Sequence, residues 1–183
     1  MVRPWERLDS WEVYQAKIFS VCKERSRSES SGREHEFDIL ETSDWVNVIA
    51  LTDKGNVALI RQYRHGTREV TVEIPGGMVE RDEPPLQAAR RELAEETGYT
   101  AERWEQIGVV EPNPAFQTNR TYTFIARGAR RTTEPQPDPN EEIEVEEHPL
   151  EEIPGLMRDG TIKHALVICA FFYLALKGEL ELS

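Results

Sequence analysis

The sequence predicts a mixed α/β fold, in which a β-sheet is flanked by helices. Alternating segments rich in β-forming residues occur before and after one amphipathic helix at about 84–97, and a strongly apolar helix is expected at 162–177. This order of strands, helix, strands and terminal helix is typical of a mixed sheet with helices on its faces. The 183 residues, 38% of them hydrophobic, are enough for one domain with a real core.

The first strand is expected at residues 11–22, where apolar and polar residues alternate. The polar tract 23–34 predicts a hairpin loop or turn, because it lacks apolar periodicity. Residues 53–56, Asp-Lys-Gly-Asn, have the composition of a hairpin turn. The remaining expected strands are 36–40, 45–51, 57–63, 70–74, 104–110, 121–126 and 143–147.

The helix at 84–97 has recognisable signals at both ends. Asp82 or Glu83 can cap its beginning, and the prolines at 84 and 85 suit its first turn. Gly98 is placed to end it in a left-handed conformation. A further short helix is expected at 150–158.

Three carboxylates, Glu92, Glu95 and Glu96, fall on one side of this helix, beside the face that packs. Like charges at these spacings repel each other, and a hard divalent cation would reverse that penalty. Oxygen ligands of this kind suit Mg²⁺ or Mn²⁺. The alternative for three glutamates alone is a solvated acidic helix.

The full spacing favours the metal site. Gly77, Glu83 and the run 91–99, Arg-Glu-Leu-Ala-Glu-Glu-Thr-Gly-Tyr, together resemble the Nudix box, the signature of the Nudix hydrolase family. The resemblance implies an α/β/α sandwich with an N-terminal β-extension, and hydrolysis of a nucleoside diphosphate linked to another moiety. It also implies a single Nudix domain over 1–183, with strands in 1–44 for dimerisation and substrate recognition and the core in 45–183.

The resemblance also implies roles for the box residues. Glu92 and Glu96 are the expected metal ligands, with Glu95 as a third ligand or an orienting partner. The backbone carbonyl of Gly76 is expected to complete the metal shell. Arg91 and Glu83 are interpreted as a structural ion pair between loop and helix.

A general base is expected in the acidic segment before the last strand. The run Asn140-Glu-Glu-Ile-Glu-Val145 resembles the segment that returns a late glutamate to the metals in ADP-ribose pyrophosphatases. Its position favours Glu141, both as base and as metal ligand, with Glu142 as a further catalytic candidate. The alternative is a solvated acidic loop.

Substrate recognition is predicted at Arg61-Gln62-Tyr63-Arg64, because arginine forks match phosphate oxygens. Alternation along a strand points Arg61 and Tyr63 to one side and Gln62 and Arg64 to the other. The segment resembles a motif before the box of ADP-ribose and nucleotide-sugar pyrophosphatases, which implies that Arg64 contacts substrate. A surface salt bridge is the alternative.

Two aromatic residues near the N-terminus, Trp11 and Phe37, are candidates for stacking on the substrate base. Ordinary packing in a sheet is the alternative for both. Homodimerisation through the N-terminal strands is implied by the resemblance.

The formal net charge of −12 argues against nucleic-acid binding, which needs a basic surface. The longest apolar run, 165–176, is well short of the ~20 residues of a membrane span, the N-terminus has no apolar signal region, and two cysteines make no disulfide framework. We therefore expect a cytoplasmic enzyme that needs Mg²⁺ or Mn²⁺ and splits ADP-ribose or a related nucleoside diphosphate sugar. A Nudix hydrolase of a dinucleoside polyphosphate or an oxidised nucleotide, and a non-catalytic binding module, are the alternatives.

Overall fold

The computed structural model describes residues 2–138 and 140–182. By their internal contacts these residues divide into two compact units. Unit 1 contains the residues up to 43 and Glu111–Arg120, and unit 2 contains Asp44–Val110 and the residues from 121 onward. The expected single domain over 1–183 stays a prediction.

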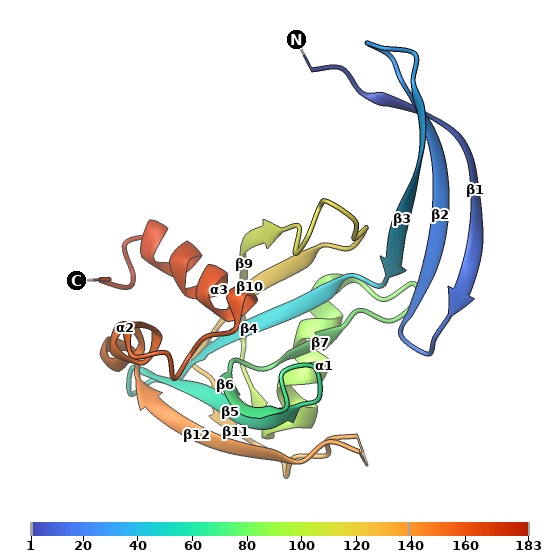
Figure 1. Cartoon of the computed structure of the whole chain (residues 1–183). Coiled ribbons are helices and arrows are strands. Elements are labelled where there is room, and N and C mark those ends of the chain that lie inside the picture. Colours follow the sequence, from blue (N-terminus) through green and yellow to red (C-terminus); the bar gives the residue numbers. More distant parts are fainter. Residues whose placement is uncertain (1, 139, 183) are drawn as a thin grey trace. The chain divides into compact units, whose positions relative to one another are not determined.

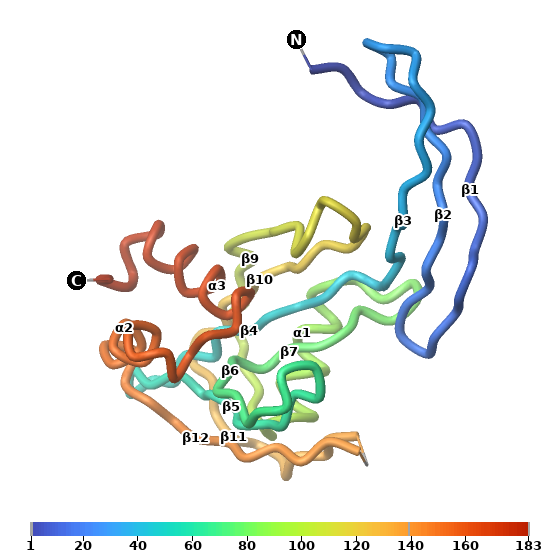
Figure 2. The backbone as a smooth tube through the Cα atoms, viewed as in Figure 1, coloured from blue at the N-terminus to red at the C-terminus, as the bar shows by residue number. Residues whose placement is uncertain are grey.

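Unit 1 is built on a three-stranded antiparallel sheet in the order β1 (Trp5–Gln15), β2 (Phe19–Ser28) and β3 (Glu34–Thr42). The three strands run side by side in Figures 1 and 2. The expectation of one strand over 11–22 was wrong, because the chain turns after Gln15, where the Ala16 N–H donates to the Phe19 carbonyl.

The polar tract 23–34 was expected to be a hairpin loop or turn, and the hairpin turn between β2 and β3 does lie within it, but the tract also contains the end of β2 and the first residue of β3. Residues 23–28 complete β2, and their charged side chains are satisfied across the strands. Arg27 donates to Glu34 at 2.8 Å, and Lys23 donates to Asp38 at 2.9 Å. Partners on neighbouring strands therefore stabilise a strand that has no apolar periodicity of its own.

Unit 2 contains a mixed sheet in the order β12-β5-β4-β10-β9, with β6 paired to β5 and β7 paired to β4. β10 runs parallel to β4, and the other pairs are antiparallel. The strands of this sheet are β4 (Trp45–Leu51), β5 (Asn56–Arg64), β6 (Glu69–Glu73), β7 (Gly76–Met78), β9 (Arg103–Val110), β10 (Thr121–Arg127) and β12 (Ile143–Pro149). A separate pair joins β8 (Tyr99–Thr100) to β11 (Arg130–Arg131).

Helices pack on both faces of this sheet, as predicted (Figure 1). One core cluster joins Ile49 and Leu59 to α2 (Ile153–Arg158) and α3 (Ala165–Leu176). The other joins Val48 and Ala58 to α1 (Pro85–Thr97). Successive strand residues thus alternate between the two cores, which separates an α1 face from an α3 face of the sheet.

The predicted central helix is confirmed, with α1 running from Pro85 to Thr97 and Gly98 following it at φ +73°. The expected cap by Asp82 or Glu83 was wrong, because Pro84 holds the cap position without a side-chain hydrogen bond. The C-terminal helix begins three residues later than expected, and the predicted helix at 150–158 is a 3₁₀ turn, η1 (Leu150–Glu152), that leads into α2.

Two further expectations concern the cysteines and the membrane. Cys22 is a buried free thiol and Cys169 is a half-buried one. Within residues 2–138 and 140–182, no helix is both long and apolar enough to cross a membrane.

Candidate active site

The loop of the box runs between a strand and the carboxylates of α1. Gly76 pairs with Asn47 of β4, and a Cβ at Gly76 would lie 2.2 Å from the carbonyl oxygen of Val46. A Cβ at Gly77 would lie 2.4 Å from the carboxyl carbon of Glu92. A Cβ at Gly76 would collide with the backbone of β4, whereas a Cβ at Gly77 would have to displace the Glu92 carboxylate, so the two glycines let the loop approach both the strand and the box carboxylates.

Glu96 is the most enclosed carboxylate of the box, with only 4% of the residue exposed. Its Oε2 accepts a hydrogen bond of 2.9 Å from the backbone N–H of Gly76. Burial raises the pKa of Glu96 well above its usual value, and the charges of Glu92 and Glu141 add to that rise, whereas the Gly76 N–H opposes it. A positive charge beside Glu96 would relieve this unfavourable burial.

Glu92 lies one turn earlier on the same helix and is also largely enclosed. Burial raises the pKa of Glu92, and Arg91, which donates to its Oε1 at 2.8 Å, opposes the rise. The charges of Glu95 and Glu141 raise the pKa of Glu92 further. Glu95 and Glu141 therefore lie close enough to Glu92 for their charges to act on its carboxylate.

Arg91 connects the loop and the helix, as expected. It donates to both carboxylate oxygens of Glu83, at 3.1 and 3.0 Å, so the predicted ion pair is confirmed. It also donates to the Met78 carbonyl at 3.0 Å and to Glu95 at 3.1 Å. The Glu95 side chain is 45% exposed, and its contact with Arg91 leaves both expected roles open, that of a third ligand and that of an orienting partner.

The segment after β11 is bonded to the C-terminal end of α1. The N–H groups of Thr132 and Thr133 donate to the Gly98 carbonyl, and the Gln136 N–H donates to the Glu95 carbonyl. These contacts satisfy carbonyl groups that the end of a helix leaves free. They also lead the chain back along the box helix toward Glu141.

The structure brings Glu141 to the box carboxylates. The Glu141 N–H closes a turn on the Asp138 carbonyl at 2.8 Å, and β12 then pairs Ile143 with Gln62. The charge of Glu141 contributes to the raised pKa values of Glu92 and Glu96. Within the described part of the chain, Glu142 makes no hydrogen bond, ion pair or comparable electrostatic contact.

Arg64 faces these carboxylates, whereas Arg61 does not. Ala58 packs on the α1 face, so alternation along β5 places Gln62 and Arg64 on that face and Arg61 on the other. Arg64 donates to Glu73 through Nε at 2.9 Å and Nη2 at 2.7 Å. The hydrogen bonds to Glu73 raise the pKa of Arg64, burial lowers it, and the charges of Glu96 and Glu141 add to the rise.

The partner of Arg64 was not identified from sequence. Glu73 is 3% exposed, so this pair is not the surface salt bridge that was the alternative for Arg64. By contrast, Arg61 lies 4.0 Å from Glu146 in an exposed pair. In the sequence, Glu73 stands out only as an acidic residue near the end of the expected strand 70–74, which follows Arg64 along the chain. That is a weak signal for an ion pair between them.

The residues present fit a divalent metal by their chemistry. Glu92, Glu96 and Glu141 offer only oxygen donors, which suits Mg²⁺ or Mn²⁺. As the side chains are oriented, no three acidic, histidine or cysteine side chains of the described residues are already arranged as ligands of one ion. Glu92 is held by Arg91 instead, so a metal would have to compete with that contact.

Trp11 and Phe37 lie in unit 1 on opposite faces of its sheet. Trp11 is opposite Lys23 and Phe37 is opposite Glu24, and consecutive residues of β2 point to opposite faces. Phe37 packs edge-on against Trp5 and His35. A base cannot lie between Trp11 and Phe37 of the same chain.

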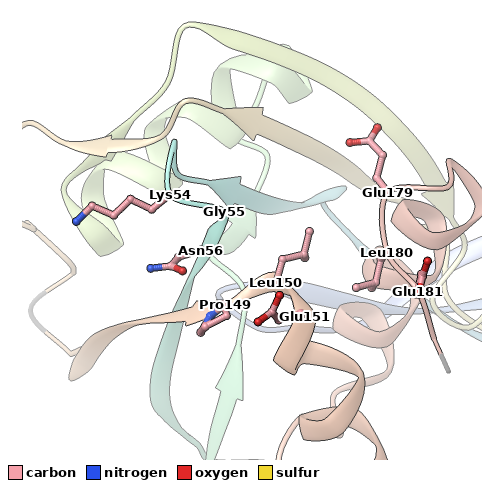
Figure 3. Close-up of a pocket in the computed structure, with 9 residues that line it drawn as sticks. All are labelled: Lys54, Gly55, Asn56, Pro149, Leu150, Glu151, Glu179, Leu180 and Glu181. Atoms are coloured by element: carbon pink, nitrogen blue, oxygen red, sulfur yellow. The ribbon is translucent and has the colours of Figure 1, made fainter.

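An open hollow of about 610 Å³ lies elsewhere on unit 2 (Figure 3). It is lined by the turn Lys54–Asn56, by Pro149–Glu151 and by Glu179–Glu181. That turn follows the end of β4, whereas the box loop pairs with its beginning, Trp45–Asn47. The hollow is therefore not the place where the box carboxylates lie. The candidate active site is identified by the acidic side chains of the box and not by the presence of a hollow.

The chain is similar to a known protein family and to named relatives. The NUDIX domain family model matches residues 42–171. The chain is 33% identical over 171 residues to an ADP-ribose pyrophosphatase of Bacillus subtilis (strain 168), covering 93% of this chain and 92% of that protein. It is 29% identical over 177 residues to a methanol dehydrogenase activator of Bacillus methanolicus, covering 96% and 92%.

A solved structure shows the same fold. The crystal structure of an ADP compounds hydrolase superposes with a TM-score of 0.85 and covers 98% of both chains. Its sequence identity is 20%, so this likeness concerns the fold alone.

Proposed function

The chain belongs to the NUDIX domain family, and from that premise we propose that it hydrolyses the pyrophosphate of ADP-ribose or a related nucleoside diphosphate sugar. The products would be a nucleoside monophosphate and a sugar phosphate. The observation that carries the proposal is the enclosed Glu96 carboxylate, held by the Gly76 N–H one helical turn from Glu92, where the charges of Glu141 and Arg64 also act on it. A similar protein that is an ADP-ribose pyrophosphatase supports the choice of substrate.

Glu92 and Glu96 would hold Mg²⁺ or Mn²⁺, together with Glu141 and the Gly76 carbonyl. A bound divalent cation neutralises charge that develops on the phosphate oxygens in such reactions. Glu95 orients Arg91, which in turn holds Glu92 beside the box loop. Hydrogen bonds between these side chains would thus hold the oxygen atoms that bind the metal in position.

The remaining roles belong to residues that contact water or substrate. Glu141 would accept the proton of the attacking water, because it is the acidic residue that the chain returns to the box from outside α1. Arg64 would donate to a phosphate oxygen of the substrate. Either Trp11 or Phe37 would contact the substrate base. The two residues of one chain would not both contact the same base, because they lie on opposite faces of their sheet.

A substrate panel tests the proposal. The purified protein is incubated with Mg²⁺ and ADP-ribose, ADP-glucose, GDP-mannose, UDP-glucose, a dinucleoside polyphosphate or a nucleoside triphosphate, and the products are separated by chromatography. We expect a nucleoside monophosphate from the sugar nucleotides, fastest from ADP-ribose. Faster cleavage of the polyphosphate or the triphosphate would move the assignment to another Nudix substrate, and no metal-dependent turnover would favour a binding module.

We also propose that the protein is a homodimer formed through the strands of unit 1. Several large apolar side chains on and beside β1 are exposed, among them Trp5, Val13, Tyr14 and Ile18. Exposed apolar groups on an edge strand are typical of an interaction surface. Light scattering on the eluted protein would give twice the chain mass, and a monomer at micromolar concentration would contradict the proposal.

A further inference from the structure

We propose that Glu73 is a positioning residue, which fixes the guanidinium group of Arg64 in the orientation that binds a phosphate of the substrate. This inference rests on the proposed function, because it assigns a role at the same site. Glu73 itself is not expected to touch the substrate. It would act by holding Arg64 in one orientation before the substrate arrives.

The contacts of Glu73 are those of a fixed carboxylate. Its side chain is 3% exposed, and each of its oxygens accepts from Arg64, Oε1 from Nε at 2.9 Å and Oε2 from Nη2 at 2.7 Å. The Thr71 hydroxyl donates a third bond to Oε1 at 2.6 Å. Val72 and Ile74 pack on the α3 face, so alternation places Thr71 and Glu73 on the α1 face with Arg64.

Two parallel hydrogen bonds fix the plane of a guanidinium group, because they prevent rotation about its last bonds. The edge that carries Nε and Nη2 is occupied by Glu73, which leaves Nη1 without a partner among the described residues. The Arg64 side chain remains 42% exposed. Its free edge is therefore accessible to a phosphate oxygen.

The position of Arg64 makes this orientation relevant to the reaction. Arg64 is the last residue of β5, where a long side chain could adopt many rotamers. The pair with Glu73 instead holds it close enough to Glu96 and Glu141 for their charges to act on it. Ordering a contact group in advance removes part of the entropy cost of binding.

A purely structural role explains the pair less well. Enclosing a carboxylate costs desolvation energy, and well-packed apolar side chains often stabilise such a position at least as well as an ion pair does. The same face of the sheet packs Ala58 and Val48 against α1 in the ordinary way. An enclosed charge at this point is better explained by what it does to Arg64.

The same strand offers a matched control. Arg61 lies 4.0 Å from Glu146, and both side chains are at least one-third exposed. That pair is on the other face of the sheet and has a single long contact. Removing the charge of Glu146 should therefore leave the reaction unchanged.

The test compares Glu73→Gln, Arg64→Ala, the double variant and the control Glu146→Gln. For Glu73→Gln we expect KM for ADP-ribose to rise about tenfold, as for other residues that orient a contact group, with a smaller change in kcat. The affinity for ADP, measured by calorimetry without metal, should fall in parallel. Glu146→Gln should match the wild type in both measurements.

The double variant shows whether Glu73 acts through Arg64. If it does, Glu73→Gln adds nothing to the loss of kcat/KM that Arg64→Ala already causes. Additive losses, or a Glu73→Gln variant with wild-type KM and ADP affinity, would overturn the inference. If Glu73→Gln does not fold, Thr71→Val replaces it, and an unchanged KM in that variant has the same meaning.

The outcomes also separate this inference from the proposed function. A wild-type protein that cleaves no sugar nucleotide contradicts the proposed function, whatever the variants do. A wild-type protein that cleaves ADP-ribose, together with an unaffected Glu73→Gln variant, contradicts only the role of Glu73.

Discussion

The backbone N–H of Gln136 donates a hydrogen bond of 2.7 Å to the carbonyl oxygen of Glu95, the middle glutamate of the box. This bond joins the segment after β11 to the end of α1. Thr132 and Thr133 add two more bonds to the Gly98 carbonyl. The helix that carries Glu92 and Glu96 therefore also directs the segment that carries Glu141.

Gly98→Ala should disturb this connection. A residue at φ +73° costs about 1–2 kcal/mol when it is not glycine, and the new Cβ would lie 2.2 Å from the Thr133 carbonyl oxygen. Crowding of that kind adds about 1–3 kcal/mol. Urea unfolding should show the sum of both losses, and kcat should fall because Glu141 moves.

Gly160→Ala is the control for that experiment. Gly160 has φ +82°, but a Cβ there would meet no atom within 4 Å. The Gly160→Ala variant should lose only the roughly 1–2 kcal/mol of stability that positive φ costs a non-glycine residue, and its kcat should be unchanged. Equal losses of stability in the two variants would show that the Thr133 contact does not matter.

Glu96→Gln should keep the fold and lose most of the activity, by more than the ~10–100-fold that is typical when a residue supporting a metal ligand is lost. The amide oxygen can still accept from the Gly76 N–H. Because burial raises the pKa of Glu96, the ionised carboxylate is unfavourable in the metal-free protein, so the variant should be no less stable at pH 7. Saturating Mg²⁺ should raise the Tm of the wild type but not that of the variant. A folded variant with full turnover would contradict the metal assignment.

Glu141→Gln should lower kcat more than it raises KM, because it removes a proton acceptor and keeps the shape of the side chain. Glu144→Gln is its control. Glu144 is exposed and pairs with Arg61 in the register of β12 and β5. Steady-state kinetics should show a lower kcat for Glu141→Gln than for Glu144→Gln. Equal kcat values would support the alternative, in which Glu141 is a solvated loop residue.

Arg64→Ala should destabilise the protein by about 1–3 kcal/mol at pH 7, since it leaves the enclosed Glu73 carboxylate without its cation. In the wild type, burial raises the pKa of Glu73, but the bonds from Arg64 outweigh it and the pKa lies below the usual value. In the variant the bond from Thr71 still lowers the pKa of Glu73, but burial, the largest influence on that pKa, is no longer offset by Arg64. We therefore expect a folded-state pKa above the unfolded one and a stability that falls as the pH rises through it. The difference between variant and wild type should therefore shrink as the pH falls toward about 4.3, the usual pKa of Glu.

Urea unfolding at several pH values measures that effect. Arg61→Ala is the comparison, because its exposed pair should be worth less than about 1 kcal/mol at any of these pH values. A loss for Arg64→Ala that is independent of pH would show that the Glu73 charge is not the cause.

The sequence by itself determined the features that depend on local chemistry. Local features indicate this helix: the spacing of Leu93 and its apolar neighbours, the prolines at its start and Gly98 at its end. The observed α1 begins within one residue of its expected start. The turn expected at 53–56, which the structure closes on Thr52, and the box acids were equally evident, because turn residues and a fixed motif act over short distances.

Only the tertiary structure decided which distant residues meet. The strand at 23–28 lies between β1 and β3 and pairs with both, with ion pairs to β3, and the opposite faces of Trp11 and Phe37 follow from strand register. The pairing of Arg64 with Glu73 and the return of Glu141 depend on neighbouring strands and on backbone bonds to α1. The packing of the whole sheet decides which of these segments meet, so the sequence indicated the return of Glu141 only through the family resemblance and carried no more than a weak signal for Glu73.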